Sequence, residues 1–141
     1  MDATIVFPNQ LFKSSPALSR KREIFILQDP LFFSDTEYPA FFHKNKILLH
    51  LLSIDYYRQE LSDSGYDVQI IELEQLQNQD SYISFFKKNN ITEIYFCDPV
   101  DYVITKRLDI ATKKLKLKTY KYDTPLSVSY THLRAHETQQ H

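Results

Sequence analysis

The sequence contains one cysteine, Cys97, one glycine, Gly65, and no tryptophan among its 141 residues. A single cysteine excludes a disulfide framework and a multi-cysteine zinc or iron–sulfur site within this chain. A single glycine excludes the glycine-rich phosphate loops GxGxxG and GxxxxGK, because both contain more than one glycine. The apolar runs are too short to cross a bilayer, and the N-terminus lacks the basic start and long apolar core of a signal peptide. We therefore expect a cytoplasmic protein with no membrane partner.

No charge of one sign dominates the sequence. Its 17 Lys and Arg against 18 Asp and Glu give a net charge of -1, which excludes a chain that binds nucleic acid by bulk charge. The lysine-rich stretch 113–118 alternates with leucine and is better explained as protection of a sheet edge. With 43% hydrophobic and 25% charged residues, the composition is that of a folded domain, and the length suits one domain.

Short β-branched runs alternate with helical patterns along most of the chain. Strands are predicted at residues 3–7, 23–28, 68–73, 94–97 and 117–122, and helices at residues 44–62, 81–88 and 100–115. In the first helix, apolar residues stand at positions 47, 48, 51, 52, 54, 57 and 61, and this spacing predicts an amphipathic helix. Buried strands separated by helices predict an α/β fold, a Rossmann-like parallel five-stranded sheet with helices on both faces.

Parallel sheets of this kind bind ligands beyond the carboxyl ends of their strands, where the strand order reverses. This rule selects residues 8–12, residues 29–33 and the pair Asp98-Pro99. Amide and carboxylate side chains beside apolar residues there suit a planar polar heterocycle. Taken singly, each loop is equally explained as a turn, because Asn and Asp near Pro are common turn formers.

Signatures of catalysis are missing from the sequence. It contains no GxSxG, HExxH or CxxC motif, so we assign no catalytic residue and no metal ligand. His50 lies between leucines in a predicted helix and is expected to be a partly buried structural residue. Cys97 ends an apolar strand and is expected to behave as a small buried hydrophobe.

The C-terminal segment from residue 127 to residue 141 has no amphipathic period. Its stretch from Val128 to Thr138 resembles, codon by codon, a translated transposon-end adapter from DNA sequencing libraries. We therefore divide the chain into a native part, residues 1–126, and a non-native tail, residues 127–141. The alternative is a metal-binding tail that uses His132, His136 and His141.

The native part resembles a known family in the order of its motifs. These are ATIVFPNQLF after the N-terminus, then QDPLFF, then FFHKNKILLHLLSIDYYRQELSDSGYDVQIIE. Over residues 3–125 they resemble the N-terminal domain of the deoxyribodipyrimidine photolyase-related proteins, the bacterial cryptochrome/photolyase branch with an iron–sulfur cluster. The resemblance implies an α/β domain that binds an antenna chromophore, typically a ribityl-lumazine. It also implies a larger helical domain that binds FAD, an iron–sulfur cluster and damaged DNA.

On this resemblance the chain is an antenna domain that ends before the FAD domain begins. Its partners would be the chromophore and the FAD domain of the same full-length chain, with DNA bound only through that missing domain. Excitation energy would pass from the chromophore to FAD, and the fragment alone would not repair DNA.

The resemblance also implies roles for individual residues. Asn9 and Gln10 match a polar Asp-Gln pair and would bond the edge of the ring, although Pro8-Asn9 stands where Gly-Asp is usual. Asp29 would accept a hydrogen bond from the ribityl hydroxyls or the ring. The expected cofactor-binding residues are Asn9, Gln10, Leu11, Asp29, Pro30, His43, Lys44, Lys46, Asp98 and Pro99.

Two other hypotheses remain open from the sequence. One is a stand-alone module that binds an adenine nucleotide without light chemistry. The other is an inert fragment, in which the aromatic segment Leu31–Phe42 would be exposed and prone to association.

Overall fold

The computed structural model describes residues 1–12, 14–32, 44–77 and 80–124, with only the backbone described at residues 32 and 44–46. The strands are β1 (Asp2–Val6), β2 (Glu23–Leu27), β3 (Val68–Ile71), β4 (Glu93–Cys97) and β5 (Lys118–Tyr122). The helices are α1 (Lys44–Asp63), α2 (Ser81–Lys88) and α3 (Tyr102–Leu115), with short 3-10 helices η1 (Pro30–Phe32) and η2 (Leu73–Leu76). Three expectations lie wholly or largely outside the described residues: the tail at 127–141, the position of His43, and the segment Leu31–Phe42 from residue 33 onward.

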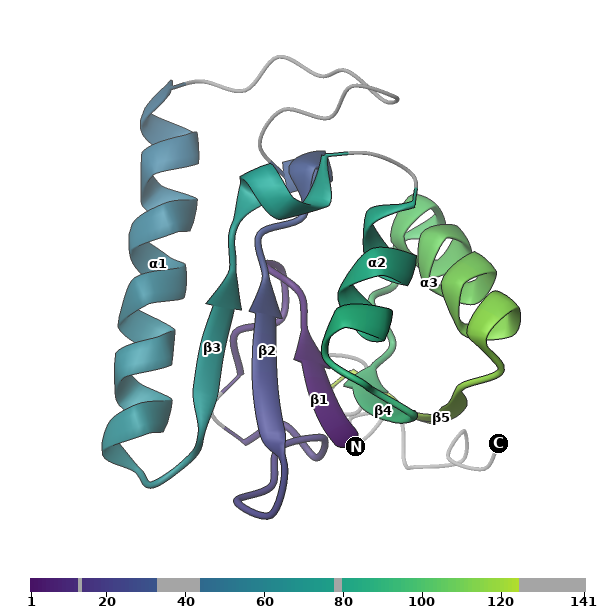
Figure 1. Cartoon of the computed structure of the whole chain (residues 1–141). Helices are drawn as coiled ribbons and strands as arrows, with labels where there is room; N and C mark the ends of the chain where they lie inside the picture. The colour runs from purple at the N-terminus through teal and green to yellow at the C-terminus, as the bar shows by residue number, and fades with distance from the viewer. Residues whose placement is uncertain (13, 33–43, 78–79, 125–141) are drawn as a thin grey trace, which may run out of the picture.

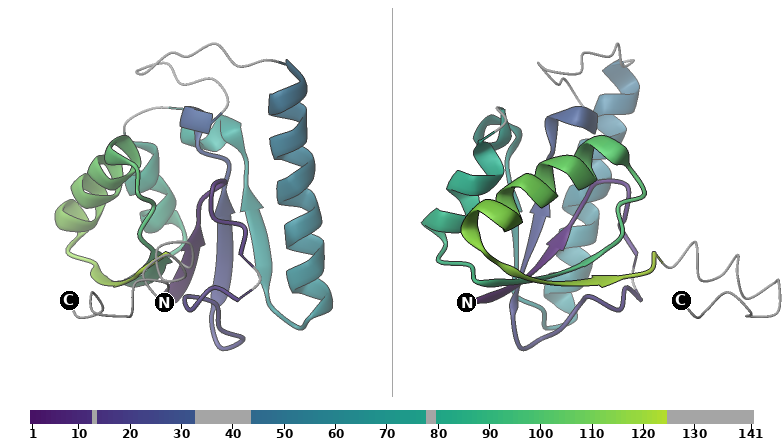
Figure 2. Two further views of the ribbon diagram at one scale, coloured as in Figure 1. Left: turned by 180° about the vertical axis from the view of Figure 1, so that it is seen from behind. Right: turned by 90° about the vertical axis from the view of Figure 1, so that its right-hand side faces the viewer.

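The strands form one parallel sheet in the order β3-β2-β1-β4-β5. The helix α1 covers one face, and α2 and α3 cover the other (Figures 1 and 2). The expected Rossmann-like α/β fold is therefore confirmed. Within the described ranges, no helix combines the length and the apolar character that a membrane span needs.

Most of the expected elements appear with shifts of one or two residues at their ends. The helix α1 ends at Asp63, and the chain then turns through Gly65, whose φ of +92° lies in the region that favours glycine. The helix α3 begins at Tyr102, two residues later than expected, because Asp101 caps it by accepting a hydrogen bond of 3.0 Å from the Ile104 N–H. The 3-10 helices η1 and η2 were not expected, because such short turns leave no periodic pattern.

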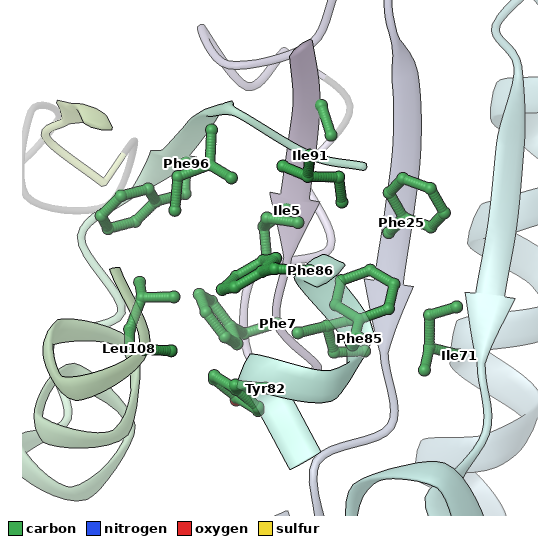
Figure 3. Packing of buried hydrophobic residues seen from close by; sticks show 14 of the residues in the cluster. Ile5, Phe7, Phe25, Ile71, Tyr82, Phe85, Phe86, Ile91, Phe96 and Leu108 are labelled. Carbon is green, nitrogen blue, oxygen red and sulfur yellow. The ribbon is translucent and has the colours of Figure 1, made fainter. Parts of the chain in front are cut away.

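The larger core lies between the sheet and the pair α2 and α3. Figure 3 shows aromatic rings from β2, β4 and α2 gathered there, together with the ring of Phe7, the residue that follows β1. The Phe25 and Phe85 rings pack edge to face with centroids 5.0 Å apart. The labelled members of this cluster are Ile5, Phe7, Phe25, Ile71, Tyr82, Phe85, Phe86, Ile91, Phe96 and Leu108.

The second core lies under α1. Ile54, Tyr57 and Leu61 of α1 are buried against Ile24 and Ile26 of β2. Two of the apolar positions counted in the predicted amphipathic helix, Leu48 and Leu52, are exposed on the outer side of α1. The sequence did not distinguish them because α1 is apolar on two sides, and periodicity alone does not say which side packs on the sheet.

The described residues that connect β1 to β2 (7–12 and 14–22) contain no helix to cover the sheet. Arg22, at the end of this connection, covers part of the sheet instead. Its guanidinium donates to the Thr4 hydroxyl (2.8 Å) and to the Ala17 carbonyl (2.7 Å). It also lies over the Tyr95 ring, 3.5 Å from the centroid, and that ring stacks on Tyr120. A cation–π stack thus takes the place that a crossover helix would fill.

Candidate functional site

The exits of β1 and β4 meet where the strand order reverses. From β1 the chain runs outward through β2 and β3, and then returns to place β4 on the other side of β1. The Gln10 amide donates to the carbonyls of Cys97 (3.2 Å) and Asp98 (2.6 Å), and the Asn9 amide donates to the Pro99 carbonyl (3.1 Å). The structure therefore brings together Asn9, Gln10, Asp98 and Pro99, as the loop rule requires. The side-chain amides of Asn9 and Gln10 thus both donate hydrogen bonds to backbone carbonyls.

Val100 adds backbone strain at the same place. Its φ of +53° lies in the left-handed region, which β-branched residues rarely adopt. The Asp98 carboxylate accepts a hydrogen bond of 2.9 Å from the Val100 N–H and so holds this conformation. Strain of this kind is concentrated at binding and active sites, so Val100 marks the exit of β4 as a candidate site.

A pocket of about 320 Å³ opens between the β1 exit and α1. It is lined by Pro8, Asn9, Leu11, Leu49, His50 and Ser53. Its walls combine apolar side chains with an amide, an imidazole and a hydroxyl, the mixture typical of small-molecule sites.

A wider groove of about 660 Å³ continues along α1 and shares Leu11 and Ser53 with the pocket. Tyr57 lines this groove, and its hydroxyl donates a hydrogen bond of 2.6 Å to the Phe12 carbonyl. Burial raises the pKa of the Tyr57 phenol, so it remains a protonated donor well above neutral pH. Tyr57 thus fixes the β1 exit loop against α1.

Asp29 follows β2 but belongs to a different arrangement. It is fully buried, and it accepts hydrogen bonds from the Tyr82 hydroxyl (2.5 Å), the Arg107 guanidinium (3.0 Å) and the Leu31 N–H (2.9 Å). Burial and the neighbouring Asp29 carboxylate raise the pKa of Tyr82, which keeps its proton. Asp29 and the buried Pro30 therefore lie on the α2 and α3 side of the sheet, away from the residues that line the pocket.

The three expected basic residues are placed only in part. Lys44 and Lys46 belong to the first turn of α1, which lies at the carboxyl edge of the sheet (Figure 1). Their side chains and His43 lie outside what the structure describes.

Several residues of this region were not assigned from the sequence. Leu49, His50 and Ser53 line the pocket from α1, and their helical spacing could have placed them on one side of that helix. Arg107 and Tyr82 bind Asp29 although both are distant from it in the sequence, and no local sequence pattern predicts such contacts.

A second hollow of about 410 Å³ lies on the opposite face, between β3 and α2. It is lined by Gln69, Ile71, Gln75, Ser81, Ser84, Phe85, Lys88 and Asn89. It lies at the edge of the sheet rather than at the reversal of strand order, so it is the less favoured place for a ligand.

Comparison with known proteins finds a curated viral relative. The chain is 30% identical over 125 residues to "Uncharacterized protein R852" of Acanthamoeba polyphaga mimivirus. The alignment covers 86% of this chain and 63% of that protein, so the chain spans less than two thirds of the relative's length.

A match to a protein-family model identifies the family of this chain more directly than the viral relative does. The model described as "Deoxyribodipyrimidine photo-lyase-related protein" matches residues 4–138, a range that takes in the pocket, the Asp29 contacts and almost all of the sheet. The match also continues past the expected boundary at Leu126. The chain belongs to the deoxyribodipyrimidine photo-lyase-related protein family.

Proposed function

We propose that this chain is the α/β domain of a photolyase-related protein and that it binds an antenna chromophore of the ribityl-lumazine type. The observation that carries the proposal is the pocket lined by Asn9, Leu11, His50 and Ser53 at the reversal of strand order. Parallel sheets bind ligands at this position, and the family membership makes a light-absorbing ligand the natural candidate.

The size and the lining of the pocket both suit such a ligand. Its volume of about 320 Å³ is at the lower end of the range for small-molecule sites. Leu11 and Leu49 supply apolar contacts for a flat ring. The Asn9 side chain, whose N–H donates to Pro99, retains its carbonyl oxygen as an acceptor for a ring N–H or a ribityl hydroxyl.

The chromophore would absorb light and pass its excitation energy to FAD. This chain contributes the rigid β1 exit, held by Gln10 and Tyr57, which fixes the position of the ring. FAD, an iron–sulfur cluster and DNA would be bound by a separate helical domain of the longer protein, and photorepair is proposed only for that protein.

The direct test is a fluorescence titration of the folded chain with a ribityl-lumazine. Because the chain lacks tryptophan, the ligand's emission is easily separated from that of the protein. We expect saturable binding, and we expect Ser53→Phe to weaken it about tenfold by filling the pocket. The matched control is Ser84→Phe, which makes the same change in the hollow beside α2 and should leave binding unaltered.

Failure to bind, or equal effects of the two substitutions, would overturn the proposal. The competing hypothesis is an adenine nucleotide, which absorbs only near about 260 nm and has no visible emission. A parallel titration with ATP distinguishes the two hypotheses, since a nucleotide-binding module would bind ATP and would not bind the lumazine.

A further inference from the structure

The outer side of α1 carries an exposed apolar stripe. Leu48, Leu49, Leu52 and Tyr56 are 54%, 64%, 56% and 68% exposed. Their spacing places them along one side of the helix, and their exposure shows that this side faces away from the sheet. The opposite side already packs on the second core through Ile54 and its neighbours. Large apolar side chains gathered in this way on a surface mark an interaction site.

The charges along α1 indicate which way a partner would run. The first half contains Lys44 and Lys46 and no acidic residue, whereas the second half contains Asp55, Glu60 and Asp63 with Arg58 as its one basic residue. This order opposes the helix dipole, which favours acidic residues at the start and basic residues at the end. A second α1 in antiparallel orientation compensates for it, because each basic half then lies beside an acidic half and the two dipoles oppose. A parallel pair would place like charges together.

We propose that two copies of this chain associate through the outer sides of α1, antiparallel and related by a two-fold axis near Leu52. Leu52 then meets the partner's Leu52, and Leu48 lies opposite the partner's Tyr56. The apolar stripe is self-complementary, and so is the order of charges along the two halves of α1, as an isologous interface requires.

The groove of about 660 Å³ beside the stripe supplies space for the packing. A two-fold axis keeps each flank of α1 against the same flank of the partner helix. The partner's Leu49 therefore comes over the groove between Ser53, Tyr56 and Glu60, in the manner of a knob entering a hole. Because the stripe consists of four side chains on one helix, whereas a standard interface uses roughly 20–30 residues a side, we expect a weak, concentration-dependent dimer.

Sedimentation velocity across the micromolar range tests the association. We expect the mass to rise from one copy to two and no further, because a two-fold interface is closed. Leu52→Glu should hold the chain as a monomer over the same range. Ile110→Glu on the outer side of α3, where the residue is also exposed, should leave the dimer intact.

Cysteine cross-linking tests the position of the axis. The native Cys97 is buried, so Leu52→Cys introduces the one accessible thiol among the described residues. Mild oxidation should convert Leu52→Cys into a disulfide-linked dimer and leave Ile110→Cys largely uncross-linked. A monomer at every concentration, assembly beyond two copies, or equal cross-linking of both variants would overturn the proposal. Because Leu11 and Ser53 line both the pocket and the groove, the lumazine titration is made at concentrations where the chain is a monomer, so that it stands or fails separately.

Discussion

The Tyr82 hydroxyl donates a hydrogen bond of 2.5 Å to the Asp29 carboxylate and thereby joins the start of α2 to the end of β2. Both residues are buried, so water cannot replace either partner. Because β2 leads directly into η1, this contact fixes the course of the chain as it leaves the sheet.

Tyr82→Phe should destabilise the fold while leaving its packing intact. The substitution keeps the ring and removes the donor, so the buried carboxylate loses one of its partners. We expect a loss of about 1–3 kcal/mol in the free energy of unfolding, measured by urea denaturation. Tyr102→Phe is the control, because Tyr102 is exposed and should change stability by less than about 0.5 kcal/mol. Equal losses in the two variants would mean that the hydrogen bond contributes nothing.

Asp29 and Arg107 should behave as a coupled pair in a double-mutant cycle. Asp29→Asn removes the negative charge that the mostly buried guanidinium contacts at 3.0 Å, and Arg107→Met removes the positive charge that the carboxylate contacts. Each single change should cost about 3–5 kcal/mol, because breaking a buried ion pair leaves the charge of the remaining partner less well compensated. The double variant should lose clearly less than the sum of the two. Simple additivity in urea denaturation would show that the ion pair is not the unit that stabilises this end of the sheet.

Stability should fall when the pH rises above about 10, where tyrosines of the unfolded chain ionise. The pKa values of Tyr57 and Tyr82 are raised, chiefly by burial, so the folded state keeps these protons when the unfolded state has lost them. The unfolded state then binds fewer protons, and the free energy of unfolding decreases with pH. Below pH about 10 both states are protonated, and these groups contribute no pH dependence.

The alkaline loss is tested with Tyr57→Phe. This variant should be less stable at neutral pH, because it lacks the hydrogen bond to the Phe12 carbonyl. Its stability should nevertheless decline less steeply between about pH 9 and pH 11, as followed by urea midpoints. An unchanged slope would show that Tyr57 ionises equally easily in both states.

The sheet was predictable because its strands carry their own signal. Runs such as those containing Ile5 and Phe25 are β-branched or aromatic, buried on both faces, and ended by polar residues or proline. The single glycine correctly placed the end of α1. The side of α1 that packs on the sheet was less predictable, because Leu48 and Ile54 look alike in a sequence and only tertiary packing separates them.

The candidate site was predictable in position and less so in its contacts. The positions of the loops after β1 and β4 were enough to predict that Gln10 and Asp98 lie near each other, and the two residues form a hydrogen bond. The loop rule also selected Asp29, but its partners Tyr82 and Arg107 come from two helices distant in sequence. Long-range contacts of this kind depend on the angles at which helices pack, which no local pattern encodes.

Val100→Asn should stabilise the chain. The side chain of Val100 is exposed, so little packing is lost, and asparagine tolerates a φ of +53° far better than a β-branched residue does. We expect a gain of about 0.5–1 kcal/mol in urea denaturation. Val103→Asn serves as the control, because it makes the same exchange within α3 and should destabilise the chain. A loss at position 100 would show that Val100 is held by contacts rather than strained.

The stability of the chain should depend more on the hydrogen bonds that the Gln10 side chain donates than on the shape of that side chain. Gln10→Leu leaves the carbonyls of Cys97 and Asp98 without their donor, so we expect a loss of about 1–3 kcal/mol and weaker lumazine binding. Gln10→Glu retains the shape but places a carboxylate against two carbonyl oxygens, so at neutral pH its loss should be larger. Lowering the pH towards the usual glutamate pKa of about 4.3 should restore part of it, because the protonated acid can donate one hydrogen bond. Urea midpoints of both variants between about pH 4 and pH 8 measure this difference. If the Glu variant matched the Leu variant at every pH, the amide would be a spacer and not the clasp between β1 and β4.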